Sequence, residues 1–343
     1  MGRTWCAYCK RRGHSLYEDR VLYIEIVCVK SRICGRCYQS KEFLTDLFNA
    51  RSTLPKDNGD FILLCRNLWE LDAGIEANKD YKINPRLNDY NNNGHEVDEE
   101  TDLGAAAAVA PRKGHLFEYL RDAVLEIPIF RYFIDLLEML GSSASGFRSD
   151  CELVGLFLDE VVQHKCGERL RSYLKERNLA DGGRVDFKEK LRKTWFHQTE
   201  NDGVLSCAFQ RVFIGKLKMY ERTRKLKAES FVSGIHNWIR FYLLEKGGDI
   251  TYSGIHGKQC PSDEKKIMNV EFICDHDVIK PVGSTFFGTS PAFEICLYTA
   301  AFLCGCQEGH TYIRLGSHNV DLYCPSNVQN GDDELAICYP VED

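Results

Sequence analysis

The hydrophobic pattern changes from a helical to a strand-like period partway along this 343-residue chain. Between His115 and Trp195, apolar residues recur at three- and four-residue spacing, which predicts helices, and the glycine and serine residues of 141–146 separate two of them. After Gly203 the apolar runs are short and lie between polar turns. Helices followed by strands predict an α+β fold with mixed or antiparallel sheets.

The same pattern gives the expected elements. We expect helices at 187–195, with Asp186 as the N-cap, at 231–245 and at 291–303. We expect strands at 212–214, 270–273, 312–315, 320–323 and 335–338.

Export and membrane insertion are not indicated. The longest apolar run, Phe293 to Cys306, has about fourteen residues and includes Glu294, whereas a membrane-spanning helix needs roughly 20. The N-terminal residues contain no apolar segment of the signal-peptide type. The sequence therefore predicts an intracellular protein, cytoplasmic or nuclear, with no membrane partner.

The charge balance excludes a general attraction to nucleic acid, because the formal net charge is -6. One stretch differs from the rest: 211–227 holds seven basic residues and a single acidic residue. Such a stretch can concentrate phosphate groups locally. From charge alone, a solvated surface is the better interpretation.

The cysteines point to a metal. The chain has 16 cysteines, and without an export signal they are better interpreted as reduced thiols than as disulfides. Two CxxC turns, Cys6 to Cys9 and Cys34 to Cys37, predict a tetrahedral Zn²⁺ site that stabilises a small zinc-ribbon-like module. His14 or Cys28 is an alternative to one of these four ligands, and a redox CxxC is a weaker interpretation. The module is expected to contact RNA or a protein partner.

These features predict the following organisation. The zinc module takes 1–40, a linker takes 41–60, a mainly helical lobe takes 61–200 with a flexible insertion at 88–114, and an α+β lobe takes 201–343.

Two runs in the second half carry candidate chemistry. The first, Gly234 to Tyr242, places His236 at the start of a helix. The second, Lys280 to Pro291, combines a lysine, a tight glycine turn and hydroxyl groups, and it opens a helix. Backbone N–H groups and a lysine in such a turn can hold a phosphate. Taken separately, each run is more often structural than catalytic.

Taken together, the two runs resemble the EndoU family of poly(U)-specific endoribonucleases, whose catalytic module is shared with the coronaviral uridylate-specific endoribonuclease. The resemblance covers about 61–343 and is dense after Phe187. It is carried by His236 to Tyr242 with Glu245-Lys246, Lys280 to Ser284, Ser290-Pro291, Phe293-Glu294, Leu297-Tyr298-Thr299 and Tyr339-Pro340-Val341. Weaker matches are Leu68-Trp69, Asp80 to Asn84, Phe187-Lys188, Leu191 and Trp195-Phe196.

The resemblance implies a helical lobe followed by a mixed or antiparallel sheet lobe, and an enzyme that cleaves single-stranded RNA 3′ of uridylate. The ribose 2′-oxygen attacks the neighbouring phosphorus and leaves a 2′,3′-cyclic phosphate. Two histidines and a lysine act in such enzymes, often with Mn²⁺ or Ca²⁺. The resemblance makes His236 the second histidine and Lys280 the lysine. It makes Ser284, next to Thr285, and Tyr339 the substrate-binding residues.

The chain departs from the family at the first histidine. The family pattern is roughly SGFEHVFxGE, and here Arg211 stands in place of the histidine, with Gln210 and Lys216 in place of two acidic residues. An arginine cannot exchange protons at neutral pH, although it can bind a phosphate through two N–H groups. Losing two carboxylates also weakens any Mn²⁺ or Ca²⁺ site.

Three functional hypotheses follow. The first is a slow nuclease, or one that recruits another histidine such as His197, His256 or His276. The second is an RNA-binding protein that no longer cleaves. The third is an adaptor, in which the zinc module recruits a partner and the large domain is a scaffold.

Overall fold

The computed structural model describes residues 59–85, 114–142, 147–180, 182–201, 204–220, 229–256, 266–274, 278–305, 309–329 and 332–342. The backbone divides into two compact units, Met1–Ile62 and Leu63–Asp343. The predicted zinc module with its four cysteines lies outside the described residues, as does nearly all of the linker 41–60 and of the insertion 88–114. Among the described helices, none is long and apolar enough to cross a membrane.

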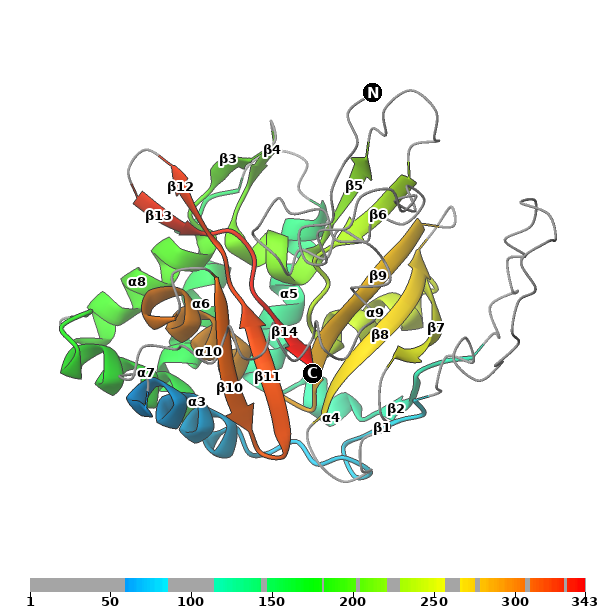
Figure 1. Ribbon diagram of the computed structural model, residues 1–343, viewed down its shortest axis with the longest axis horizontal. Coiled ribbons are helices and arrows are strands. Elements are labelled where there is room, and N and C mark those ends of the chain that lie inside the picture. Colours follow the sequence, from blue (N-terminus) through cyan, green and yellow to red (C-terminus); the bar gives the residue numbers. More distant parts are fainter. Residues whose placement is uncertain are drawn as a thin grey trace, which may run out of the picture. The chain divides into compact units, whose positions relative to one another are not determined.

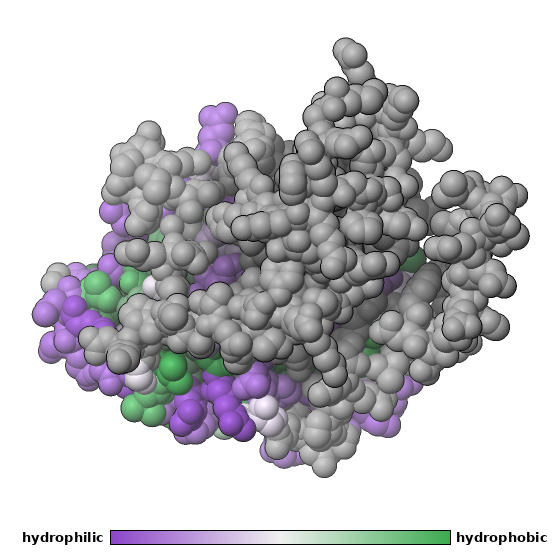
Figure 2. Space-filling model, in the orientation of Figure 1, coloured by the Kyte–Doolittle hydropathy of each residue, from purple (hydrophilic) through white to green (hydrophobic). Residues whose placement is uncertain are grey.

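The first half of the chain is mainly helical (Figure 1). Its elements are α3 (Gly59–Leu71), β1 (Tyr81–Ile83), β2 (Phe117–Leu120), α4 (Asp122–Leu125), α5 (Pro128–Ser142), α6 (Glu152–Gln163), α7 (Lys165–Glu176) and α8 (Arg184–Phe196). The coloured residues at the left of Figure 2 are mostly hydrophilic, with small hydrophobic patches between them. Exposed apolar side chains such as Val185 and Leu179 are scattered, as on most soluble protein surfaces.

The second half adds the sheets (Figure 1). Its elements are β3 (Thr199–Asn201), β4 (Val204–Ser206), η2 (Gln210–Ile214), β5 (Lys216–Tyr220), β6 (Glu229–Ser233), α9 (Trp238–Gly247), β7 (Ile250–His256), β8 (Lys266–Cys274), β9 (Val278–Phe287), α10 (Pro291–Cys304), β10 (His310–Leu315), β11 (His318–Tyr323), β12 (Ser326–Gln329), β13 (Asp332–Leu335) and β14 (Tyr339–Glu342). A five-stranded sheet has the order β5-β6-β9-β8-β7, and a three-stranded sheet has the order β10-β11-β14. Every pair is antiparallel except β6 with β9. The expected α+β class is confirmed.

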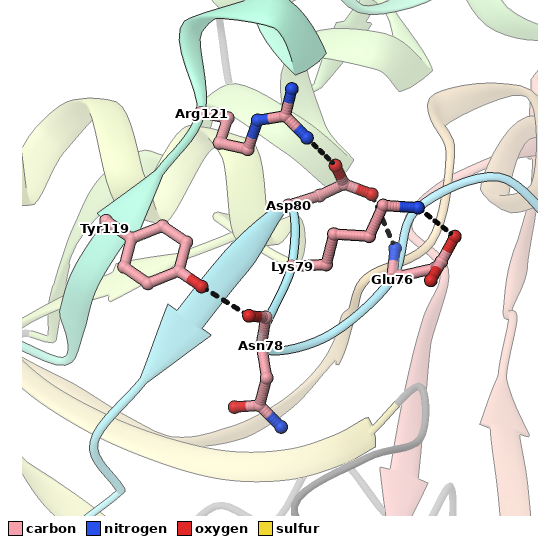
Figure 3. Close-up of polar contacts among 6 residues, drawn as sticks. All are labelled: Glu76, Asn78, Lys79, Asp80, Tyr119 and Arg121. Atoms are coloured by element: carbon pink, nitrogen blue, oxygen red, sulfur yellow. Dashed lines mark hydrogen bonds and ion pairs between the residues drawn. The ribbon is translucent and has the colours of Figure 1, made fainter.

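A polar network closes the turn in front of β1 (Figure 3). The Asp80 carboxylate accepts a 2.9 Å hydrogen bond from the backbone N–H of Glu76 and another of 2.9 Å from Arg121. The Tyr119 hydroxyl donates to the backbone carbonyl of Asn78 at 2.6 Å. Asn78 has a φ of 62°, a left-handed conformation that asparagine tolerates better than most residues. The network joins β1 to β2 across a long stretch of sequence.

Long-range strand pairing overrides the helical sequence pattern at two places. Residues 117–120 continue the helical period, yet they form β2, because they pair with β1 in the register Tyr81↔Leu120. Likewise, the predicted helix 231–245 was wrong at its start, since β6 takes 229–233 and α9 begins only at Trp238. The helix at 187–195 is confirmed within α8, but its N-cap is Gly183 rather than Asp186, which lies in the first turn.

Three expected strand or turn features also differ. Residues 212–214 form the π-helical turn η2, in which Val212 and Phe213 are buried and the Phe213 ring stacks on Trp195 at 5.5 Å. Only Leu335 of the predicted strand 335–338 belongs to a strand. The expected glycine turn after Lys280 is instead part of β9, whose register with β8 is irregular there. Proline lacks an N–H for the ladder, so an irregularity at Pro281 is the usual outcome.

Helix α10 runs through the core, as its apolar sequence predicts. It begins at Pro291 behind the N-cap Ser290, whose hydroxyl accepts from the N–H of Phe293, and its first eleven residues are all buried. It contacts α5, α6 and α7. The indole N–H of Trp195 on α8 donates to the hydroxyl of Thr299 at 2.9 Å. A proline at the first position and a serine cap are strong helix-start signals, which explains why this element was predictable.

A buried carboxyl group joins the starts of α9 and α10. Glu294 is fully buried, and its Oε1 accepts hydrogen bonds from the amide of Asn237 at 2.9 Å and from the hydroxyl of Thr289 at 3.1 Å. The Tyr298 hydroxyl lies 3.5 Å from Oε2. Burial raises the pKa of Glu294 well above its ordinary value, and the negative charge of Asp72 acts in the same direction. Glu294 therefore keeps its proton to a higher pH than an exposed glutamate does.

We expect Glu294→Gln to be more stable than the wild type at neutral pH, because glutamine keeps the acceptor and has no proton to lose. A carboxyl group whose folded-state pKa exceeds 4.5 contributes fully below about pH 4.5. That contribution falls as pH rises toward the folded-state pKa, by about 1.4 kcal/mol per pH unit. Urea denaturation at about pH 5 and about pH 8 gives the free energies of unfolding of Glu294→Gln and of the wild type. The difference between the two proteins should be larger at the higher pH.

Two further variants serve as controls. Glu294→Leu leaves the Asn237 and Thr289 donors without an acceptor and should lose about 2–4 kcal/mol at both pH values. Glu176→Gln, on the exposed end of α7, should match the wild type at both. A stability difference between Glu294→Gln and the wild type that stays the same at about pH 5 and about pH 8 would contradict the raised pKa of Glu294.

Candidate active site

His236 lies at a tight junction between β6 and α9. Gly234 and Ile235 both have positive φ values, 86° and 58°, and the backbone N–H of His236 donates to the Val212 carbonyl of η2 at 3.2 Å. A Cβ on Gly234 would come within 2.5 Å of the Cα of Gly215. The two segments of backbone can therefore approach this closely only when residue 234 is glycine. The junction holds the backbone of His236 against η2.

The side chain of His236 lies between two other elements. Its ring stacks on the Tyr339 ring from β14, with centroids 4.1 Å apart and planes 6° apart. Its Nδ1 lies 3.4 Å from the backbone carbonyl oxygen of Ser284 in β9. His236 is 3% exposed and Tyr339 is 8% exposed. A proton on Nδ1 would point at that carbonyl and leave Nε2 as the proton acceptor.

Two of the predicted substrate-binding residues, Ser284 and Tyr339, lie beside His236, whereas Thr285 does not. Ser284 is buried, and its hydroxyl donates a hydrogen bond to the Oδ1 of Asn269 in β8. Thr285 is the next residue of the strand, so its side chain lies on the opposite face of the sheet. Lys280 pairs with Phe272 through the backbone of β9, and its side chain lies outside the described part of the chain.

Aromatic rings continue from Tyr339 across the three-stranded sheet. Tyr323 of β11 lies opposite Tyr339 and opposite His310, and its ring centroid is 5.4 Å from the first ring and 4.8 Å from the second. His310 in turn contacts Asp321, with 2.8 Å between Nδ1 and Oδ2. This packing keeps the Tyr339 ring in its place beside His236.

Arg211, which the sequence resemblance predicts to replace a histidine, is hydrogen-bonded to the protein itself. Its Nε donates to the carbonyl of Ala336 at 2.7 Å and its Nη2 to the carbonyl of Leu335 at 2.7 Å. Its Nη1 donates to the carbonyl of Ser206 at 2.9 Å and reaches the hydroxyl of Thr199 at 3.4 Å. Burial lowers the pKa of the guanidinium, but an arginine keeps its charge in proteins.

The Arg211 contacts have a structural consequence. Ser206 ends β4, while Leu335 and Ala336 lead from β13 toward Tyr339. One guanidinium therefore joins η2 to β4 and to the segment that carries the ring beside His236. Each such bond from a charged donor stabilises the fold more than a neutral one does.

Gln210 and Lys216, which the resemblance predicts to replace two acidic residues, do not suit a hard cation such as Mn²⁺ or Ca²⁺. The Gln210 amide is already used, because its Nε2 donates to the Leu140 carbonyl and its Oε1 accepts from the N–H of Cys207. Lys216 is a cation, and its side chain is not among the described ones. In the described parts of the chain, no group of three or more His, Cys, Asp or Glu is arranged to hold a metal.

The three alternative histidines are placed as follows. His197 follows α8 as its C-cap. His256 ends β7 at the register position opposite Asn269, and its side chain is not described. His276 lies outside the described residues. The described side chains therefore bring no second histidine ring into contact with His236.

Sequence reasoning did not identify three residues, Glu294, Asn237 and Asn269, as supports of the site. Glu294 carried a signal, because a charged residue inside a long apolar run is buried only when it has partners. Asn237 and Asn269 gave little signal in the sequence, since single asparagines occur in many turns and strands. Asn237 caps α9 by accepting from the N–H groups of Ile239 and Arg240.

Known proteins share this arrangement of elements. Residues 60–340 match the family model described as Endoribonuclease XendoU. The chain is 30% identical over 258 residues to the poly(U)-specific endoribonuclease of Xenopus tropicalis, which is 72% of this chain and 82% of that protein. It is 31% identical over 195 residues to the uridylate-specific endoribonuclease of Homo sapiens. Those aligned residues make up 55% of this chain and 44% of the human protein.

A solved structure agrees with the sequence comparisons. The structure of XendoU, described as a splicing independent snoRNA processing endoribonuclease, superposes with a TM-score of 0.64 at 27% identity. The match covers 84% of this chain and 99% of that one. The family model spans far more than half of the residues, so the chain belongs to the XendoU family of endoribonucleases.

Proposed function

We propose that this protein binds single-stranded, uridine-rich RNA and cleaves it slowly by attack of a ribose 2′-oxygen on the neighbouring phosphorus, leaving a 2′,3′-cyclic phosphate. The observation that carries the proposal is the convergence of His236, Tyr339 and Ser284 from three separate elements. The names of the XendoU relatives, which describe poly(U)- and uridylate-specific endoribonucleases, support RNA as the substrate.

In this proposal His236 is the group that moves a proton. Imidazole suits the task because its pKa lies near neutral pH. The Ser284 carbonyl near Nδ1 favours the tautomer whose Nε2 can accept or return a proton. Tyr339 holds the orientation of the His236 ring by stacking on it. Lys280 would balance the negative charge that gathers on the phosphorane oxygens.

The reaction needs a proton acceptor for the 2′-hydroxyl and a proton donor for the 5′-oxygen, and family members use a histidine for each. Arg211 can be neither. Losing one proton-transfer group typically costs about 10²–10⁴-fold in rate. Because the residues at 210 and 216 do not suit a hard cation, we assign no step to Mn²⁺ or Ca²⁺ and expect cleavage to persist in a chelator.

A second candidate function is RNA binding without cleavage. The observation that favours it is that the nitrogens of Arg211 donate to backbone carbonyls, so this position contributes stability rather than chemistry. The predicted zinc module, through Cys6, Cys9, Cys34 and Cys37, would then add contacts to RNA or to a protein partner. The adaptor hypothesis requires neither RNA binding nor cleavage.

A cleavage assay separates these functions. We expect the wild type to cut a fluorophore-quencher RNA with a single uridine-rich segment, with or without a chelator, and His236→Ala to lower the rate at least about 10²-fold. His115→Ala, which alters an exposed histidine, should leave the rate unchanged. Mass spectrometry of the product should show the cyclic phosphate.

The other outcomes are equally informative. Salt-sensitive binding without cleavage would establish the RNA-binding function and exclude the nuclease. Absence of both RNA binding and cleavage would favour the adaptor hypothesis. Cleavage that survives in His236→Ala would remove this residue from the mechanism.

The structural role of Arg211 predicts a stability effect. We expect Arg211→Lys to lower the free energy of unfolding by about 2 kcal/mol or more, because an ammonium group cannot reach three carbonyls on two segments at once. Arg148→Lys is the matched control, since Arg148 is exposed and forms an ion pair with Asp150, two residues away. That change should stay within about 0.5 kcal/mol of the wild type.

Arg211→His restores the family residue but removes the same hydrogen bonds. We expect it to lose stability like Arg211→Lys and, assayed well below its unfolding temperature, to cleave faster than the wild type. Equal stability of Arg211→Lys and Arg148→Lys would show that the Arg211 contacts do not hold the segments together.

A further inference from the structure

Two buried cysteines, Cys324 and Cys338, lie where the ladder of β11 with β14 gives way to the ladder of β12 with β13. Between these two ladders the chain has residues 324–325 on one segment and residues 336–338 on the other. Two residues opposite three is the unequal count of a β-bulge. The bulge therefore places two cysteines on neighbouring segments next to each other.

The backbone of Cys324 leaves room for a bond toward Cys338. Its N–H donates a hydrogen bond to the carbonyl of Gly309, just before β10, and thus faces away from β14. In an antiparallel pair, residues that do not exchange backbone hydrogen bonds have the closer side chains, with Cα atoms about 4.5 Å apart. Disulfides span Cα separations of roughly 4.4–6.8 Å. The two thiols already interact with each other, so a bond between them requires little movement.

Both thiols lie on the core face of the sheet. Cys324 is 6% exposed, Cys338 is fully buried, and both are free thiols in the structure. The Sγ of Cys324 lies 3.9 Å from the carbonyl oxygen of Tyr298 in α10. Successive side chains of a strand point to opposite faces, so Tyr339, which follows Cys338, points to the other face, where its ring stacks on His236.

We propose that Cys324 and Cys338 form an oxidation site, at which a small organic disulfide such as oxidised glutathione converts the two thiols into a covalent bond between β11 and β14. The bond fixes Cys338 and therefore restricts the backbone of Tyr339, the next residue. Formation of the bond is independent of the proposed function. Its effect on the site rests on that function, because Tyr339 matters through its contact with His236.

The bond forms by two exchange steps. One protein thiol loses its proton and attacks a sulfur of the small disulfide, whose S–S bond breaks and releases a small thiol that takes up a proton. The second protein thiol then loses its proton and attacks the protein sulfur of the mixed disulfide, which releases the second small thiol in the same way. In total, two protein S–H groups are oxidised to one S–S bond, and the S–S bond of the oxidant is reduced to two S–H groups.

Burial makes this reaction slow in the folded protein. It raises the pKa of the Cys338 thiol well above its ordinary value, and the contact with the Cys324 thiol acts in the same direction. Because the thiolate is the attacking species, we expect the bond to form over hours rather than seconds. The site therefore responds to prolonged oxidation, or to oxidation during folding, and not to a brief pulse.

The sequence makes the bond easy to identify. After Arg314 the chain has no lysine or arginine, so trypsin releases one peptide that begins at Leu315 and has Cys324 and Cys338 as its only cysteines. The folded full chain is incubated overnight with excess oxidised glutathione or with a thiol reductant. Free thiols are then alkylated in denaturant, and mass spectrometry gives the mass of the peptide. We expect the oxidised peptide to carry no alkyl group and to lack the two thiol hydrogens.

A stability measurement tests whether the bond ties the strands together. The bond closes a loop of about 15 residues, so we expect the oxidised wild type to unfold at a urea concentration about 1 M higher than the reduced wild type. Cys324→Ala and Cys338→Ala should lose this increase, since neither variant can form the bond. Cys207→Ala removes a cysteine that is as buried as Cys338 but belongs to none of the described strands, and it should keep the increase.

Three results would overturn the oxidation site. The first is a wild-type peptide that keeps both alkyl groups after oxidation. The second is a peptide that carries glutathione or is joined to another cysteine, because the two thiols have then not joined each other. The third is an oxidised wild type that unfolds at the same urea concentration as the reduced protein, or a Cys324→Ala variant that gains as much as the wild type does.

RNA binding tests the effect on the site separately. Binding of a labelled uridine-rich RNA, followed by fluorescence anisotropy in increasing urea, should persist to a higher urea concentration in the oxidised protein. Loss of binding at the same concentration in both forms would overturn the effect on Tyr339. A protein that binds no RNA in either form, even without urea, would overturn the proposed function, whereas the peptide mass would still decide whether the bond forms.

Discussion

The hydrogen bonds to Glu294 hold together the part of the protein on which the candidate site depends. The buried carboxyl group accepts from Asn237, whose own oxygen caps α9, and from Thr289 just before α10. A second hydrogen bond joins the same two segments, because the indole N–H of Trp238 donates to the Thr289 carbonyl at 2.8 Å. Since a buried donor without a partner is costly, these bonds fix the start of α9 relative to the core helix. His236 is the residue immediately before that cap, so its position follows.

Arg211 shows how one substitution can change both chemistry and structure. A histidine at this position would supply a proton-transfer group, whereas arginine supplies donors in a planar fork that suits several carbonyl oxygens. Those carbonyls belong to Ser206, Leu335 and Ala336, on segments that are far apart in the sequence. The basic stretch that begins at Arg211 therefore starts with a residue whose charge is directed into the protein. Its usefulness for holding phosphate is correspondingly small.

Elements with strong local signals were predictable, and elements that depend on distant partners were not. Helix α10 was expected at 291–303 and occurs at Pro291–Cys304, because a cap, a proline and an apolar run all agree. Strand β2 looked helical, since its pairing with β1 lies more than thirty residues away. His236 and Tyr339 were both identified from the sequence, but their stacking could not be predicted. The stacking requires the sheet that contains β14 to pack beside the start of α9.

The sequence by itself determined the α+β class and the family, and it nominated His236, Ser284 and Tyr339 for the candidate site, because these inferences depend on residue type and on local spacing. Tertiary structure alone decided what those residues contact. The direction of the Arg211 side chain, the pKa of Glu294 and the contact between Ser284 and Asn269 depend on burial and on partners brought together from separate strands and helices. Such partners are set by packing and strand register, and no local pattern of residues encodes them.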